Sequence, residues 1–168
     1  LPNRKLFIDR LNAIAQFAKT APALKPTVMV IDLDRFKQVN DSVGFAVGDS
    51  ILLTLARRLT RILKPLDTLA RLSGDQFGLL LMSENEPAKI NAFAETIRKT
   101  IRAPSTFNER EIFLTASIGI VMPDPAATIS DETIKDAELA MYHAKRIGGD
   151  RIDIYKSAMR ARKNDRLT

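Results

Sequence analysis

Apolar positions along the chain recur with two different spacings, and each spacing predicts a different kind of element. Apolar side chains three or four residues apart are typical of a helix that buries one face, and they occupy the segments 3–19, 48–63, 87–101 and 130–147. Short runs rich in β-branched and other apolar residues predict strands over 27–32, 68–72, 77–82, 111–121 and 151–155. A short helix is expected over 36–43, where Gly44 closes it.

Local signals sharpen several of these boundaries. Asp49 or Ser50 is able to cap the start of the 48–63 helix, and Ser130 with Thr133 downstream opens the last long helix. The strands over 68–72 and 77–82 are separated by Ser-Gly-Asp-Gln, which predicts an antiparallel hairpin with its turn at Gly74. The strand over 111–121 is expected to pair with the segment 105–108.

The order of elements predicts the fold class. Hairpins between the helices favour an α/β (α+β) fold with a mixed, largely antiparallel central sheet of about five strands, flanked by helices and accompanied by a small hairpin. With 168 residues the chain is long enough for one core. We expect residues 1–156 to form this domain and residues 157–168 to begin a helix toward a further domain, so that the chain is a fragment of a longer protein.

Composition narrows the function. The net charge of +6 and the pI near 9.8 raise the question of a nucleic-acid partner. The basic residues are scattered over predicted helices without interleaved aromatic residues, so we expect solvated helix faces and no nucleic acid. The absence of cysteine and the single His143 exclude thiolate and histidine-rich metal sites. With no apolar run of about 20 residues, the domain is expected to be cytoplasmic, with any membrane contact made through missing parts.

Acidic residues stand at two places where the predicted sheet ends. Asp32 and Asp34 follow the apolar run 27–31, and Asp75 lies at the tip of the predicted hairpin. Carboxylates held at a sheet edge suit a divalent cation that carries a phosphate chain. The alternative is that each is a turn or strand-end aspartate satisfied by water.

Two motifs together resemble the GGDEF domain of the diguanylate cyclase family. The first is Ile-Asp-Leu-Asp-Arg-Phe-Lys-Gln-Val-Asn-Asp over 31–41, and the second is Arg-Leu-Ser-Gly-Asp-Gln-Phe over 71–77. The resemblance covers essentially the whole chain. It implies a palm-like nucleotide cyclase fold and a chemistry in which two domains, each with one GTP, form cyclic di-GMP as a homodimer.

The resemblance also implies a role for individual residues. Mg²⁺ (or Mn²⁺) would be held with GTP by the Asp32 carboxylate, the Leu33 carbonyl and the Asp75 carboxylate. The phosphates would meet the segment Arg35-Phe36-Lys37, Gly74 and Lys145. Helix-start N–H groups favour anions in such a segment, although a solvated Lys37 is the simpler alternative. The arginine that the family has four residues after Lys145 is Gly149 here.

Asn40 and Asp49 match the family positions that hydrogen-bond the edge of guanine. An amide oxygen and a carboxylate distinguish guanine from adenine because the wrong base leaves buried polar groups unpaired. For Asp49 a helix cap is the alternative.

The signature reads Ser-Gly-Asp-Gln-Phe and departs from the family pattern at two of its five positions. Gln76 stands where the family has glutamate. If that glutamate serves as a base or a charged ligand, an amide, which cannot take up a proton, predicts a rate loss of about 10²- to 10⁴-fold. Ser73 replaces a glycine, so its Cβ is expected either to intrude on the nucleotide or to strain a turn that needs positive φ. Phe45 stands where the family often has histidine.

The family's product-inhibition motif, Arg-x-x-Asp, reads Lys64-Pro65-Leu66-Asp67 here. Lysine lacks the planar fork of arginine, so feedback by cyclic di-GMP through Lys64 and Asp67 is expected to be impaired.

Three functions follow. The first is a degenerate domain that binds GTP with magnesium as a regulatory module beside a C-terminal phosphodiesterase (EAL) domain, with weak or absent cyclase activity. The second is an active homodimeric diguanylate cyclase. The third is a nucleotide-free domain used for dimerisation or docking.

Overall fold

The structure is a computed structural model of the 168-residue chain, and it describes residues 1–20, 25–124 and 126–160. The elements follow in the order α1 (Arg4–Thr20), β1 (Thr27–Leu33), α2 (Phe36–Val43), α3 (Phe45–Arg61), β2 (Thr68–Ser73), β3 (Gln76–Leu81), α4 (Pro87–Arg102), β4 (Ser105–Phe107), β5 (Arg110–Ile112), β6 (Ala116–Val121), α5 (Asp131–Arg146) and β7 (Arg151–Ile154).

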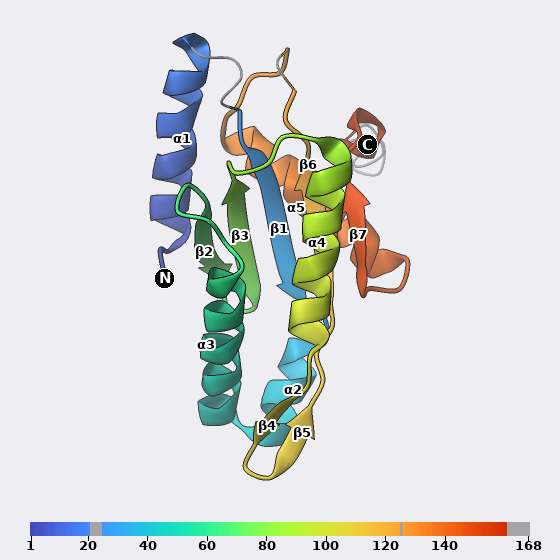
Figure 1. The fold of residues 1–168 in the computed structure, drawn as a ribbon. Coiled ribbons are helices and arrows are strands. Elements are labelled where there is room, and N and C mark those ends of the chain that lie inside the picture. The colour runs from blue at the N-terminus through green and yellow to red at the C-terminus, as the bar shows by residue number, and fades with distance from the viewer. Residues whose placement is uncertain (21–24, 125, 161–168) are drawn as a thin grey trace.

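The central sheet has five strands in the order β2-β3-β1-β6-β7, and β4 with β5 forms a separate hairpin. The pairs β2–β3, β3–β1 and β1–β6 are antiparallel, and β6–β7 is parallel. The predicted fold class, a mixed and largely antiparallel sheet with flanking helices and a small hairpin, is confirmed. β1 lies in the middle of the sheet, with the β4–β5 hairpin and α2 near the end of the sheet to which β1 points (Figure 1).

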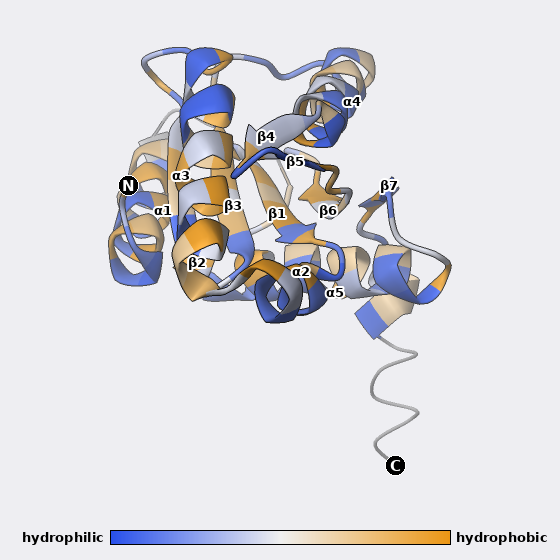
Figure 2. Cartoon of the chain, turned by 90° about the horizontal axis from the view of Figure 1, so that it is seen from below, coloured by the Kyte–Doolittle hydropathy of each residue, from blue (hydrophilic) through white to orange (hydrophobic). Residues whose placement is uncertain are grey.

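Helices cover both faces of the sheet. α3 and α4 lie on one face and α1 and α5 on the other (Figures 1 and 2). Successive side chains of a strand point to opposite faces, and β1 serves both layers: Met29 and Ile31 pack on the α3–α4 side, whereas Val28 and Val30 pack on the α1–α5 side. This explains why β1 is continuously apolar from Val28 to Ile31 instead of alternating.

Side-chain caps define the starts of α1 and α5. Asn3 Oδ1 accepts a hydrogen bond from the Leu6 N–H at 3.0 Å at the start of α1. Ser130 and Thr133 form a reciprocal capping box at the start of α5, as the sequence predicts.

Two expectations about boundaries are wrong. The strand predicted over 111–121 is interrupted, because β5 pairs with β4 whereas β6 pairs with β1 in the main sheet. Between them the Thr115 carbonyl accepts from the Asp34 N–H at 2.9 Å, which directs the chain from the hairpin into the sheet.

The second correction concerns α3, which begins at Phe45 and not at residue 48. Gly44, at φ +89°, separates α2 from α3, and glycine adopts this conformation without steric strain. Asp49 therefore lies inside the helix, so the alternative of Asp49 as a helix cap is wrong. Of the helix expected near the C-terminus, residues 157–160 are helical, and residues 161–168 lie outside the described residues.

Candidate functional site

The fold brings the two predicted metal carboxylates to the same end of the sheet. Asp32 is the next-to-last residue of β1 and faces Gln76 across the β1–β3 pairing. The Asp75 carbonyl accepts from the Leu33 N–H at 3.1 Å, which fixes the β2–β3 turn against the end of β1. Burial is the main cause of the raised pKa of Asp32, and the negative charge of Asp75 adds a smaller contribution.

Asp32 is buried, with a relative exposure of 6%, and both of its carboxylate oxygens have partners within the chain. Its Oδ1 lies 2.8 Å from the Lys145 ammonium, and its Oδ2 accepts from Gln76 Nε2 at 2.8 Å. Burial raises the pKa of Asp32, against the lowering effect of Lys145 and Gln76. Burial alone would lower the pKa of Lys145, but its hydrogen bond and charge interaction with Asp32 raise it, so the ammonium stays charged.

The same ammonium contacts two further oxygens at the end of β1. Lys145 Nζ lies 3.1 Å from Asp34 Oδ1 and 3.5 Å from the Leu33 carbonyl oxygen. Two of the three predicted Mg²⁺ ligands, Asp32 and the Leu33 carbonyl, are thus taken by Lys145. Among the described residues no group of three or more histidine, cysteine, aspartate or glutamate side chains is placed to hold a metal ion. While Lys145 holds these oxygens, they leave no place for a divalent cation.

A separate cleft of about 380 Å³ lies between α2, α3 and the β2–β3 turn. It brings together predicted site residues from three segments of the sequence; its lining includes Phe36, Lys37, Asn40, Asp49, Gly74 and Asp75. Phe45 also lies on this cleft and is 77% exposed. The cleft is the place where the predicted guanine and phosphate contacts converge.

Asn40 lies in this cleft in an unusual state, since its Oδ1 is buried and has no hydrogen-bond partner. The amide rests on Gly48, where a Cβ would stand 1.7 Å from Asn40 Oδ1. Only glycine leaves room for Asn40 at this position. Asp49 follows directly on α3 and is exposed.

Arg71 is a cleft residue to which sequence reasoning assigned no role. Its Nη2 donates to the Gly74 carbonyl at 2.8 Å and its Nε to the Ser73 carbonyl at 3.3 Å. Its backbone N–H donates to the Pro2 carbonyl at 2.9 Å, which attaches the start of the chain to β2. The available signal was the exposed carbonyls that a tight hairpin tip leaves, which need a nearby donor.

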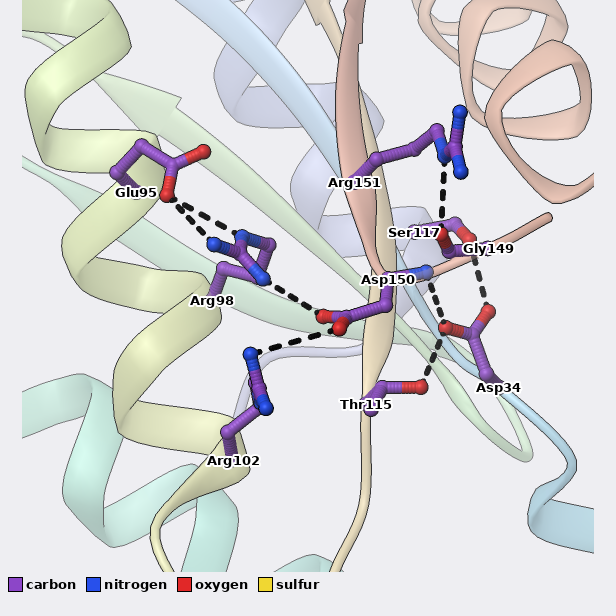
Figure 3. A network of polar contacts seen from close by, with 9 residues as sticks. All are labelled: Asp34, Glu95, Arg98, Arg102, Thr115, Ser117, Gly149, Asp150 and Arg151. Atoms are coloured by element: carbon purple, nitrogen blue, oxygen red, sulfur yellow. Dashed lines mark hydrogen bonds and ion pairs between the residues drawn. The ribbon is translucent and has the colours of Figure 1, made fainter. Parts of the chain in front are cut away.

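Asp34 has a different role from Asp32. Its Oδ2 accepts from Thr115 Oγ1 at 2.7 Å and from the Asp150 N–H at 2.8 Å, and its Oδ1 accepts from Ser117 Oγ at 2.7 Å (Figure 3). Although burial acts to raise it, these hydrogen bonds lower the pKa of Asp34. Asp34 fixes the end of β1 to β6 and to the turn before β7.

Gly149, in that turn, has φ +72° and lies so near Asp34 that a Cβ would stand 3.1 Å from its carboxylate. An arginine at this position is therefore disfavoured by backbone conformation and by space. Asp150 in turn accepts from Arg98 Nη1 at 2.8 Å, and Arg98 also pairs with Glu95, so the network reaches α4 (Figure 3).

Other predicted residues lie away from the cleft. Arg35 adopts the left-handed region at φ +58° and lines a second cleft of about 610 Å³ between α2 and the segment 110–115, together with Gln38 and Arg110.

Neither Ser73 nor Gly74 has positive φ, so the expectation that Ser73 strains the turn is wrong.

Asp67 of the predicted feedback motif is bound by its own chain. It accepts from the Lys64 N–H at 3.0 Å, from the N–H groups of Met82 and Ser83 at 2.8 and 3.1 Å, and from Ser83 Oγ at 2.9 Å. Both carboxylate oxygens thus organise the loops that flank β2 and β3.

Comparison with known proteins places these features in one family. The family model "Diguanylate cyclase, GGDEF domain" matches residues 1–151. The bifunctional diguanylate cyclase/cyclic di-GMP phosphodiesterase MucR of Pseudomonas aeruginosa is 37% identical over 167 residues, which are 99% of this chain and 24% of MucR. Diguanylate cyclase TpbB of the same species is 36% identical over 148 residues, 87% of this chain and 34% of that protein.

Solved structures of GGDEF domains have the same fold as this chain. The GGDEF domain of TpbB from Pseudomonas aeruginosa superposes with a TM-score of 0.85 at 31% identity and covers 98% of this chain and 95% of that one. The GGDEF domain of DgcB from Caulobacter crescentus, solved with c-di-GMP, gives a TM-score of 0.85 at 25% identity, with 94% and 90% covered. The chain spans about a quarter to a third of these curated relatives. No helix in its described part has the length and apolar character needed to cross a bilayer.

Proposed function

Because this chain belongs to the diguanylate cyclase GGDEF domain family, we propose that it is a GTP-binding regulatory module of cyclic di-GMP signalling whose own cyclase activity is weak or absent. The observation that supports this most directly is the cleft in which Lys37, Asn40, Asp49 and Asp75 converge from separate segments.

The chemistry of the cleft favours guanine. An unpaired buried acceptor such as Asn40 Oδ1 costs about 1–3 kcal/mol. Guanine offers N–H donors on one edge, which the Asp49 carboxylate and the Asn40 amide oxygen are able to accept once the amide turns from Gly48 toward the cleft, whereas adenine lacks this pair. Lys37 and the N–H groups at the start of α2 would then face the phosphates.

Gln76 is the reason to expect weak turnover. Its amide is a hydrogen-bond donor to Asp32 and cannot act as a base. A Mg²⁺ or Mn²⁺ ion carried by the triphosphate would use Asp32, the Leu33 carbonyl and Asp75, but only after Lys145 leaves the first two.

The wider assembly follows the relatives. We propose that the domain acts as a homodimer in the whole protein, that cyclic di-GMP is a second ligand, and that residues 157–168 lead toward an EAL domain. MucR, whose name combines cyclase and phosphodiesterase, supports this arrangement.

Calorimetric titration tests the proposal. GTP is expected to bind at least about tenfold more tightly than ATP, a difference of about 1.4 kcal/mol. Asn40→Ala with Asp49→Ala should abolish that preference, whereas Asn91→Ala, an exposed position on α4, should leave it intact. Absence of GTP binding to the native chain would refute the proposal.

A turnover assay separates the module from an active cyclase. Formation of cyclic di-GMP should be near background for the native chain, and Gln76→Glu should raise it by about 10²-fold or more if the carboxylate is the missing group. Native turnover well above background and equal to that of Gln76→Glu would favour the active enzyme instead.

A further inference from the structure

The Lys145 ammonium occupies a shell of oxygen atoms of the kind that a divalent cation uses. Asp32 Oδ1, Asp34 Oδ1 and the Leu33 carbonyl oxygen lie 2.8, 3.1 and 3.5 Å from Nζ. Carboxylate and carbonyl oxygens are the ligands that Mg²⁺ and Mn²⁺ prefer. The side chain reaches this shell from the last turn of α5, and only 28% of it is exposed.

Gln76 contacts the second carboxylate oxygen of Asp32. Its Nε2 donates to Asp32 Oδ2 at 2.8 Å, and the residue is only 9% exposed. A glutamate in this place would put a second carboxylate against Asp32, and two carboxylates at such a distance repel each other unless a cation lies between them. The amide removes that repulsion without adding charge.

Both carboxylates therefore have partners without a metal ion. Asp32 forms an ion pair with Lys145 and accepts a hydrogen bond from Gln76. Asp34 forms an ion pair with Lys145 and accepts hydrogen bonds from Thr115, Ser117 and the Asp150 N–H. A divalent cation entering here would have to displace a salt-bridged ammonium and would leave it near a second positive charge.

We propose that Lys145, held by Asp32 and Gln76, is an internal cation that takes the place of the divalent ion, so that this chain binds Mg²⁺ or Mn²⁺ only weakly when no nucleotide is present. The inference deepens the proposed function, since it concerns the same site. Its test uses no nucleotide, so the two succeed or fail separately.

Mn²⁺ binding by the nucleotide-free chain, followed by electron paramagnetic resonance, measures the effect. Gln76→Glu introduces the missing negative charge, and Lys145→Met removes the internal cation at similar side-chain length. Both variants should bind Mn²⁺ at least about tenfold more tightly than the native chain. Lys135→Met, an exposed lysine of the same helix that pairs with Glu132, should bind like the native chain.

Thermal unfolding gives a second measurement. In EDTA both active-site variants should melt below the native chain, because each leaves facing carboxylates without a cation, and 10 mM Mg²⁺ should raise their melting temperatures by about 3 °C or more. The native chain should not respond. Folding of a variant only with Mg²⁺ present would support the proposal.

Native Mn²⁺ affinity equal to that of Gln76→Glu and Lys145→Met would overturn it. If GTP fails to bind but the difference in Mn²⁺ affinity persists, the proposed function is refuted and the proposal of an internal cation is supported.

Discussion

Asp34 accepts a hydrogen bond from the backbone N–H of Asp150, 116 residues later in the chain, at 2.8 Å. This contact joins the end of β1 to the turn that follows α5, the helix that carries Lys145. Because Asp34 also holds Thr115 and Ser117, one carboxylate sets the mutual position of three segments around the candidate site.

Asp34→Ala should therefore be among the most destabilising substitutions at this end of the sheet. It removes the carboxylate from three hydrogen bonds and an ion pair, and we expect a loss of about 3 kcal/mol in the free energy of unfolding. Urea unfolding measures it. Thr115→Val, which removes one of the donors, should lose only about 1 kcal/mol. Equal losses for the two variants would contradict the central role of Asp34.

The pH dependence of stability should carry the signature of Asp34. Its pKa in the folded chain is below the ordinary value of 3.8. A lowered pKa means that the stabilisation is complete above the unfolded-state value and is lost as the pH falls through the folded-state value. The stability difference between the native chain and Asp34→Asn should thus be constant from about pH 7 to 5 and shrink below about pH 4. Chemical unfolding at each pH tests this, and a difference that grows on acidification would refute it.

Asp67 is expected to matter for stability, and Lys64 is not. Asp67→Ala leaves the N–H groups of Lys64, Met82 and Ser83 without their acceptor, so the free energy of unfolding should fall by about 2 kcal/mol. Lys64→Ala keeps its backbone N–H and should change stability by less than about 0.5 kcal/mol. If Asp67→Ala unfolds at the same urea concentration as the native chain, the carboxylate is not structural.

Local pattern was sufficient for most of the fold. The apolar run of β1, the helical spacing of apolar residues and the Ser130 cap each depend on neighbours within a few residues, so the sequence predicts them. The break between β5 and β6 has no such signal, because Phe113 and Leu114 continue the apolar pattern. A backbone contact with Asp34, 81 residues away, decides it.

In the candidate site, too, some features follow from local sequence and others depend on distant contacts. The approach of Asp32 and Asp75 follows from a strand end beside a hairpin tip, and the sequence predicts it. The sequence gives no sign that Lys145 would contact Asp32, because that depends on how far a side chain on a distant helix reaches. α3 also begins earlier than the sequence predicts. Gly44 allows the helix to start at Phe45, before the capping residues at 49 and 50.

Gly48→Ala should separate binding from stability. Its Cβ would lie 1.7 Å from Asn40 Oδ1, so the amide must leave its place, and GTP affinity should fall by about tenfold or more. The free energy of unfolding should change by less than about 1 kcal/mol. The cost of displacing the Asn40 amide is offset by the helix propensity of alanine, which exceeds that of glycine by about 1 kcal/mol. Calorimetric titration and urea unfolding measure the two effects. Ser50→Ala on the same helix is the control and should keep native affinity.

Arg71 is expected to control the order of the turn that carries Asp75. Arg71→Ala removes the donors to the Ser73 and Gly74 carbonyls, so the amides of the β2–β3 turn should exchange hydrogen faster in the nucleotide-free chain. GTP affinity should fall by about fivefold, since a disordered turn must be ordered again on binding. Arg71→Lys should recover only part of the loss, because an ammonium lacks the fixed fork that reaches two carbonyls. Arg57→Ala, an exposed arginine of α3, supplies the charge-matched control. Unchanged exchange in the turn combined with weaker GTP binding would mean that Arg71 acts on the nucleotide directly and not through the turn.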